Sequence, residues 1–194
     1  MRYSYVCDTI NARVYKGGEI RMKIISQEEL EKSKGNLDAQ IDKLYSSTNK
    51  ESDDERKRTN NYLQWISTKT QYVMDEPSFV CDKEDKLKRG AVVWIEFGFN
   101  VGDEFGGRHP AVILRKTPTS VFVVPLSSQE PSVKKDYHVK VEKVYGFKNM
   151  VRWTNVLTLQ NVSIQRIDTN ASIGNVKGKV LNDINEALKK CHIF

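Results

Sequence analysis

The sequence predicts an α+β fold: a small antiparallel β-barrel with a C-terminal helix, preceded by an N-terminal helical extension. Three observations predict it. Apolar residues recur at helical spacing before residue 76 and again over 176–191, whereas short β-branched and aromatic segments follow one another after residue 89. Short, closely spaced strands with turns between them are typical of a small barrel.

We expect three parts: a poorly defined extension at 1–22, a helical extension and linker at 23–88, and the barrel domain at 89–194. The first 21 residues show no clear period and contain Gly17-Gly18. Ser26 and Glu29 form a capping-box pattern that predicts the start of the first helix. The second helix is expected over 53–75, because Pro77 ends the pattern.

Strands are predicted in the second half, where β-branched and aromatic residues dominate. They are expected at 91–97, 111–115, 120–126, 137–142, 151–159 and 162–167. From Val176 to Cys191, apolar residues repeat at helical intervals, which indicates an amphipathic helix covering one face of the barrel.

Charge is divided unevenly along the chain. Residues 1–88 hold 16 Lys+Arg and 16 Asp+Glu, whereas residues 89–194 hold 15 and 9, so the second half carries the whole net charge of +6. Such an excess fits either a polyanionic partner or simple solubility. The three cysteines, Cys7, Cys81 and Cys191, are far apart in the sequence, which disfavours disulfides and a cysteine zinc site. We therefore expect a cytoplasmic protein, and no apolar run is long enough to cross a membrane.

Two segments offer chemistry. The glycine-rich loop 98–107 carries Glu104 and leads directly into Arg108 and His109. A buried-type strand then ends in Ser127, Ser128 and Gln129, whose polar groups either bind a phosphate or cap a turn. Each segment alone fits an ordinary turn as well as a site.

Taken in order, three blocks of sequence resemble the PemK/MazF toxins, which are endoribonucleases of toxin–antitoxin systems. The blocks are RGAVVWIEFGFNVGDEFGGRHPAVIL, VFVVPLSSQ and GFKNMVRWTNVLTLQNVSIQRID, and the resemblance covers roughly 89–191. It implies an SH3-like barrel, shared with the CcdB toxins, that forms a homodimer, binds single-stranded RNA and is neutralised by a cognate antitoxin. It also implies cleavage by the ribose 2′-OH without metal or other cofactor.

The resemblance carries over to individual residues. The family's loop glutamate matches Glu104 and its hydroxyl after the next strand matches Ser127, whereas the family's catalytic arginine column, directly before Pro110, holds His109. Histidine is a better proton shuttle than arginine at neutral pH, so His109, Ser127 and Glu104 are the expected catalytic residues. The expected RNA-binding residues are Arg108, Ser128, Gln129, Lys134, Lys135 and Arg152.

Three readings remain from the sequence. One is a metal-independent, sequence-specific endoribonuclease; another is a catalytically degenerate module on the same fold that binds RNA or an antitoxin. The third is a CcdB-like toxin that targets gyrase. Glu104 and His109 favour RNA cleavage, because a gyrase poison needs no proton-transfer groups. His138 and His192 have no partner at metal-ligand spacing, so no metal site is expected.

Overall fold

The computed structural model describes residues 14–16, 19–21 and 24–193, and the chain divides into two compact units, residues 1–60 and 61–194. Most of the segment expected as a poorly defined extension lies outside the described residues. Within it, β1 (Val14–Lys16) pairs antiparallel with β2 (Glu19–Arg21).

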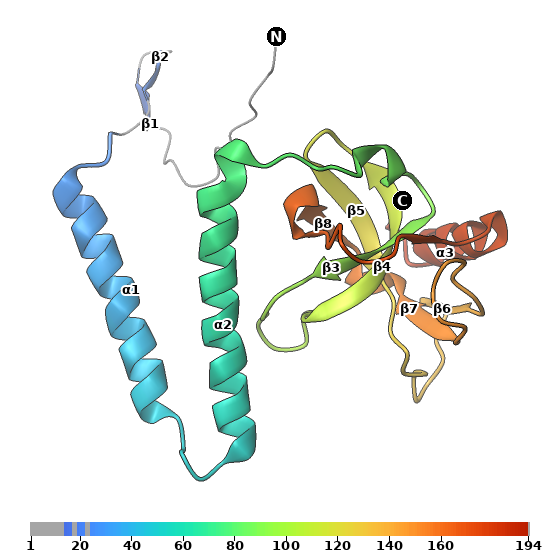
Figure 1. The fold of residues 1–194 in the computed structure, drawn as a ribbon, viewed down its shortest axis with the longest axis horizontal. Coiled ribbons are helices and arrows are strands. Elements are labelled where there is room, and N and C mark those ends of the chain that lie inside the picture. Colours follow the sequence, from blue (N-terminus) through green and yellow to red (C-terminus); the bar gives the residue numbers. More distant parts are fainter. Residues whose placement is uncertain (1–13, 17–18, 22–23, 194) are drawn as a thin grey trace. The chain divides into compact units, whose positions relative to one another are not determined.

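The first unit contains α1 (Gln27–Ser47) and the first turns of α2 (Asp53–Asp75), joined by a short connection (Figure 1). The predicted capping box is present: the Glu29 amide donates to Ser26 Oγ at 3.1 Å, and the Ser26 amide donates to Glu29 Oε2 at 3.0 Å. The hydroxyl of Thr48, at the end of α1, lies 2.7 Å from the hydroxyl of Thr59 in α2. Among residues 24–60 no apolar side chain is buried, so this stretch forms no hydrophobic core.

The second unit holds a five-stranded antiparallel sheet in the order β8-β5-β4-β3-β9 and a two-stranded ribbon, β6-β7 (Figure 1). The strands are β3 (Ala91–Glu96), β4 (Arg108–Lys116), β5 (Ser120–Pro125), β6 (His138–Val141), β7 (Arg152–Asn155), β8 (Gln160–Ser163) and β9 (Gly174–Asn175). α3 (Gly178–Lys190) follows the last strand.

Isolated backbone bridges join the ribbon to the sheet. Ser127 and Trp153 exchange two hydrogen bonds of 2.8 Å, and Tyr145 and Asn175 exchange bonds of 2.8 and 2.9 Å. The strands therefore do not close into one continuous barrel, but the predicted α+β class with an antiparallel sheet is confirmed.

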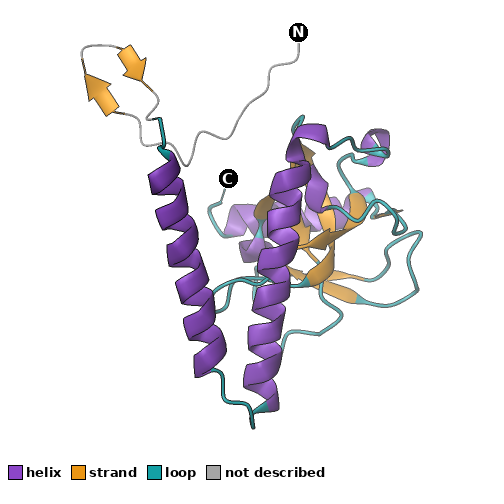
Figure 2. Ribbon diagram, turned by 60° about the vertical axis from the view of Figure 1, so that its left-hand side comes forward, coloured by secondary structure: helices purple, strands orange, loops and turns teal. Residues whose placement is uncertain are grey.

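Apolar side chains cover both faces of the sheet. One face packs against α3 through Val92, Val112, Ile184 and Leu188, and the other is built on residues such as Ile95 (Figure 2). The alternation of side chains along β3 and β4 assigns odd and even positions to opposite faces. None of the described helices is long and apolar enough to span a membrane.

Several strand boundaries differ from the expected ones. The strand expected at 151–159 ends at Asn155, because its side-chain oxygen accepts the Leu157 amide at 2.9 Å and begins a 3₁₀ turn. The strand expected at 162–167 begins at Gln160 and ends at Ser163, whose hydroxyl caps the next 3₁₀ turn. β9 has only two residues and was not predicted.

Candidate active site

His109 lies at the start of β4, opposite Ile95 of β3. Its imidazole is half-buried and packs against the ring of Phe105, with ring centroids 4.7 Å apart. Burial lowers the pKa of His109 below its ordinary value, and this effect is partly offset by a hydrogen bond with the Leu126 backbone and by the charge of Glu96. The imidazole is therefore predominantly neutral at pH 7 and has a lone pair available to accept a proton.

Pro110 explains why the Leu126 backbone is available to His109. The Leu126 amide donates to the Pro110 carbonyl at 2.7 Å, which continues the pairing of β4 with β5. In a hydrogen-bonded antiparallel pair the opposite residue donates in return, but proline has no N–H. The Leu126 carbonyl thus receives no bond from Pro110 and is left to the imidazole.

Ser127 lies one position further along the same pairing. Ala111 is opposite Pro125, and continuing the register past Pro110 and Leu126 places His109 opposite Ser127. Directly opposed residues point to the same face, so the imidazole and the hydroxyl share one side of the sheet. Ser127 is half-buried and its Oγ accepts the Gln129 amide at 3.0 Å. The structure therefore brings these two predicted residues together.

A cavity of about 430 Å³ opens beside Ser127. Phe105, Gln129 and His138 are among its lining residues, so the ring that contacts His109 also forms part of this cavity. The Lys135 amide donates to Nδ1 of His138 at 3.1 Å, which leaves Nε2 to carry the proton of the neutral ring.

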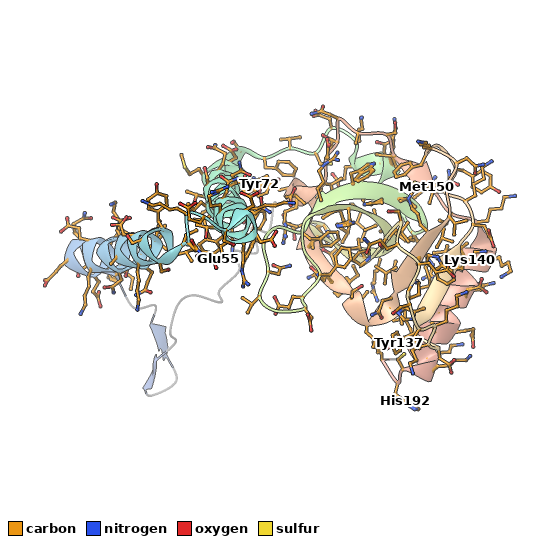
Figure 3. The ribbon with its side chains drawn as sticks, turned by 90° about the horizontal axis from the view of Figure 1, so that it is seen from below. Glu55, Tyr72, Tyr137, Lys140, Met150 and His192 are labelled. Atoms are coloured by element: carbon orange, nitrogen blue, oxygen red, sulfur yellow. The ribbon has the colours of Figure 1, made fainter. Side chains whose placement is uncertain are left out.

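His138 and Asn155 line this cavity although neither was predicted as a site residue. The two residues lie directly opposite each other in β6 and β7. Tyr137, whose ring centroid lies 4.5 Å from that of His138, is labelled in Figure 3 on the side of the second unit where α3 lies. Its alternation with Val139, which is buried, puts His138 on the opposite side of β6, but this pattern does not by itself place it at the cavity.

Glu104 lies near the tip of the loop and is exposed. Its carboxylate accepts the Val101 amide at 3.3 Å, which closes the turn. Within the part of the chain that the structure describes, no hydrogen bond or ion pair joins Glu104 to His109 or Ser127.

The expected RNA-binding residues after Ser127 fall in two places. Ser128 is exposed next to the cavity, and Lys134 pairs with Glu130 at 2.7 Å while its ammonium lies 5.2 Å from the centre of the Trp153 ring. Lys135 lines a different, larger cavity between β6 and α3.

The two expected arginines belong to a stack of cations and rings on the other face of the sheet. The Arg108 guanidinium lies 4.6 Å from the centre of the Trp94 ring, Trp94 stacks on Phe147 at 6.0 Å, and Arg152 lies 5.6 Å from the centre of Phe147. Arg108 also pairs with Asp168 at 2.6 Å, which lowers the pKa of that carboxyl. Arg152 is buried, and its burial lowers the pKa of its guanidinium.

No group of three or more His, Cys, Asp or Glu side chains that could hold a metal ion occurs among the described residues. The arrangement of His109 and Ser127 offers proton transfer by an imidazole on the same face as a hydroxyl. Both residues belong to the positively charged half of the chain, residues 89–194.

Comparisons with known proteins found one family model and several solved structures similar to this chain. A family model described as "PemK-like, MazF-like toxin of type II toxin-antitoxin system" matches residues 88–192. Solved structures similar to the chain include an endoribonuclease in complex with its cognate antitoxin from a mycobacterial species. That match has 17% identity and a TM-score of 0.41, and covers 55% of this chain and 94% of that one.

Two further matches come from Deinococcus radiodurans. One is MazF, with 18% identity, a TM-score of 0.46 and coverage of 55% of this chain and 96% of that one. The other is the MazE-MazF complex, with 16% identity, a TM-score of 0.41 and coverage of 56% and 98%. A search of curated proteins found no match. Because the family model spans more than half of the residues, the chain belongs to the PemK-like, MazF-like toxins of type II toxin–antitoxin systems.

Proposed function

We propose that this toxin is a metal-independent, sequence-specific endoribonuclease that cleaves single-stranded RNA through attack by the ribose 2′-OH. The observation that carries the proposal is the half-buried imidazole of His109 on the same face as the Ser127 hydroxyl. Its lowered pKa keeps this imidazole in the form that accepts a proton at pH 7. The family assignment and the basic second half support an RNA substrate.

The reaction can be followed atom by atom. The neutral nitrogen of His109 takes the proton of the 2′-OH, and the 2′-oxygen forms a bond to the adjacent phosphorus. The bond between phosphorus and the 5′-oxygen then breaks, and the imidazolium returns its proton to that oxygen. The products are a 2′,3′-cyclic phosphate and a 5′-OH, with no net change in protons.

Other side chains have supporting roles in this proposal. The Ser127 hydroxyl donates a hydrogen bond to a phosphoryl oxygen, where negative charge develops. Glu104 acts on the site through the turn it closes with Val101 rather than by contact with His109. Ser128, Gln129 and Lys134 follow the RNA backbone next to the cavity.

We further propose the partners and organisation that a type II toxin requires: a cognate antitoxin that competes with RNA, a homodimer in the cytoplasm, and an accessory role for the helical segment before residue 89. The mycobacterial structure, whose title names a cognate antitoxin, supports the first of these. Light scattering on the purified chain tests the homodimer, since a monomer at micromolar concentration contradicts it.

The test of the activity compares the wild type with His109→Ala and Ser127→Ala on a long single-stranded RNA in EDTA. We expect cuts at a few defined sites by the wild type, ending in cyclic phosphate, and at least about a hundredfold loss in His109→Ala. His192→Ala is the matched control, because His192 is an exposed histidine near the end of α3. Intact RNA with the wild type contradicts the proposal and favours a binding module. Cleavage that persists at a 2′-deoxy nucleotide contradicts the mechanism.

A further inference from the structure

Another cavity, of about 440 Å³, is lined by residues of α2 and of the glycine-rich loop. It falls entirely within the second unit, which includes residues 61–75 of α2. Its lining includes Gln64, Trp65 and Tyr72 from one side of α2, and Glu96, Gly107 and Arg108 from the two ends of the glycine-rich loop. This volume is within the range of pockets that bind small molecules.

Aromatic and polar contacts fix the walls of this cavity. The Trp65 ring occupies the space where a side chain on Gly98 would lie, and the Arg166 guanidinium lies 5.0 Å from the centre of that ring. Arg166 is itself fixed, because its Nε donates to the Glu96 carbonyl at 2.8 Å. Tyr62 packs edge-on against Phe99 at 5.5 Å. The cavity is thus preformed rather than a gap between loose side chains.

Tyr72, labelled on α2 in Figure 3, is held in a similar way. Its carbonyl accepts a hydrogen bond of 2.7 Å from the Gln165 side chain, and its ring lies 6.4 Å from that of Trp65. The aromatic rings of Trp65 and Tyr72 therefore both line this cavity.

The cavity is next to His109. Gly107 lines it, and a Cβ placed on Gly107 would lie 3.7 Å from Nε2 of His109. Gly107 therefore belongs both to the wall of the cavity and to the surroundings of the imidazole. When the phosphate of one nucleotide reacts at His109, the base of the adjacent nucleotide in the RNA can enter this cavity.

The polar groups select the kind of ligand. Aromatic rings with amide side chains are the combination by which proteins hold an unstacked RNA base. Glu96 receives the Gly98 amide on Oε1 at 3.0 Å, and its other carboxylate oxygen accepts no hydrogen bond from the described residues. A carboxylate accepts well from two adjacent N–H donors, and guanine presents such a pair, N1–H and N2–H₂, on one edge.

We infer that this cavity binds a guanine base of the substrate RNA, next to the bond that is cut. Trp65 and Tyr72 provide the stacking surface, Glu96 accepts from the guanine edge, and Gln64 adds a hydrogen bond. Arg108, placed by Asp168 and Trp94, contributes a positive charge to the wall of the cavity. The inference rests on the proposed nuclease function and gives the helical segment a part in choosing the sequence.

Binding of nucleotides to the full chain tests the cavity without any cleavage. Titration with GMP, AMP, CMP and UMP, followed by tryptophan fluorescence and calorimetry, is expected to show GMP at least tenfold tighter than the others. Glu96→Gln is expected to weaken GMP at least tenfold and Gln64→Ala about threefold. Gln71→Ala is the matched control, because Gln71 lies on the same helix, pairs with Asp75 and does not line the cavity.

Mapping of cut sites then separates this inference from the proposed function. We expect a guanine at a constant position beside the wild-type cuts, a relaxed choice of base with slower cutting at the guanine sites in Gln64→Ala, and the wild-type pattern in Gln71→Ala. Equal binding of the four nucleotides, or variants that behave like Gln71→Ala, overturns the inference while the nuclease stands. GMP selectivity without cleavage supports the guanine site but overturns the nuclease, and with it the position of that site next to a cut bond. Variants that lose only the antitoxin show a protein docking site instead and overturn guanine binding.

Discussion

The imidazole of His109 packs edge-on against the Phe105 ring, with the two ring planes at 62°. Phe105 also contacts the buried Phe97 and lines the cavity beside Ser127. The Phe105 ring thus contacts the core, the His109 imidazole and the cavity beside Ser127. The charge state of His109 therefore depends on how well this ring excludes water.

Phe105→Ala is expected to shift the pH dependence of RNA cleavage. Burial lowers the pKa of His109, so the wild-type rate is expected to fall on the acid side only below the ordinary value of 6.5. Removing the ring exposes the imidazole, raises its pKa toward 6.5 and moves the acid limb to higher pH. Profiles of kcat/KM against pH measure the shift. Val101→Ala, at an exposed position of the same loop, is expected to leave the limb in place.

Stability is expected to fall on acidification because of the same histidine. The folded chain holds a proton on His109 less readily than the unfolded chain, whose imidazole has the ordinary pKa of 6.5. As the pH falls through the window between 6.5 and the lower folded value, the unfolded state binds more protons, so the free energy of unfolding decreases. Above this window the histidine has no effect. Urea titrations from pH 7.5 to 5 are expected to show a smaller loss in His109→Asn, and equal slopes contradict the assigned shift.

Pro110→Ala is expected to separate the stability of the strand pair from cleavage. The new N–H can donate to the Leu126 carbonyl, which completes the pairing and adds up to about 1 kcal/mol. The same bond competes with His109, so the pKa of His109 falls further and the imidazole loses a contact that orients it. We expect RNA cleavage at least about tenfold slower with unchanged or higher Tm. An NMR titration that leaves the pKa of His109 unchanged contradicts this account.

Gly98→Ala tests whether α2 covers the loop as described. Gly98 has φ of +80°, and Trp65 occupies the position of the added methyl group. Backbone strain and the clash together are expected to cost about 2–4 kcal/mol of unfolding free energy. In a Trp65→Ala background the same change is expected to cost only about 1–2 kcal/mol, because strain alone remains. Gly102→Ala, at φ of +61° with open space around it, is the control for strain without a clash.

Thr154→Val is expected to stabilise the chain by about 1–2 kcal/mol. Thr154 is 1% exposed, and its hydroxyl has no hydrogen-bond partner within the described part of the chain. Valine keeps the shape and the preference for a strand while removing the unpaired hydroxyl. The contrasting variant is Thr158→Val, because the Thr158 hydroxyl donates to the Asn155 carbonyl at 2.7 Å. Chemical denaturation is expected to give opposite signs for the two changes.

The features that the sequence predicted depend on short-range patterns. The capping box of Ser26 and Glu29 involves residues three apart, and β4 and β5 form a tight hairpin whose turn is visible in the sequence. The same hairpin sets His109 opposite Ser127, two residues that the family resemblance, and not the strand spacing, had grouped as catalytic. The family resemblance then supplied the chemistry.

The features that the sequence did not predict depend on contacts between distant segments. β9 forms only because Gly174 and Asn175 pair with β3, more than 80 residues earlier. His138 lines the cavity because the ribbon joins the sheet through Ser127 and Trp153, which no local pattern specifies. Arg152 was expected to bind RNA, and no local pattern indicated that it would be buried beside Phe147.

The packing of α3 on the sheet has a consequence for folding during synthesis on the ribosome. Val92, near the start of the sheet, shares its core with Ile184 and Leu188 of α3. While Ile184 and Leu188 of a nascent chain are still inside the ribosome, that face of the sheet is exposed to water. Domains fold as units during synthesis. The core on this face of the sheet is therefore completed only after α3 has left the ribosome.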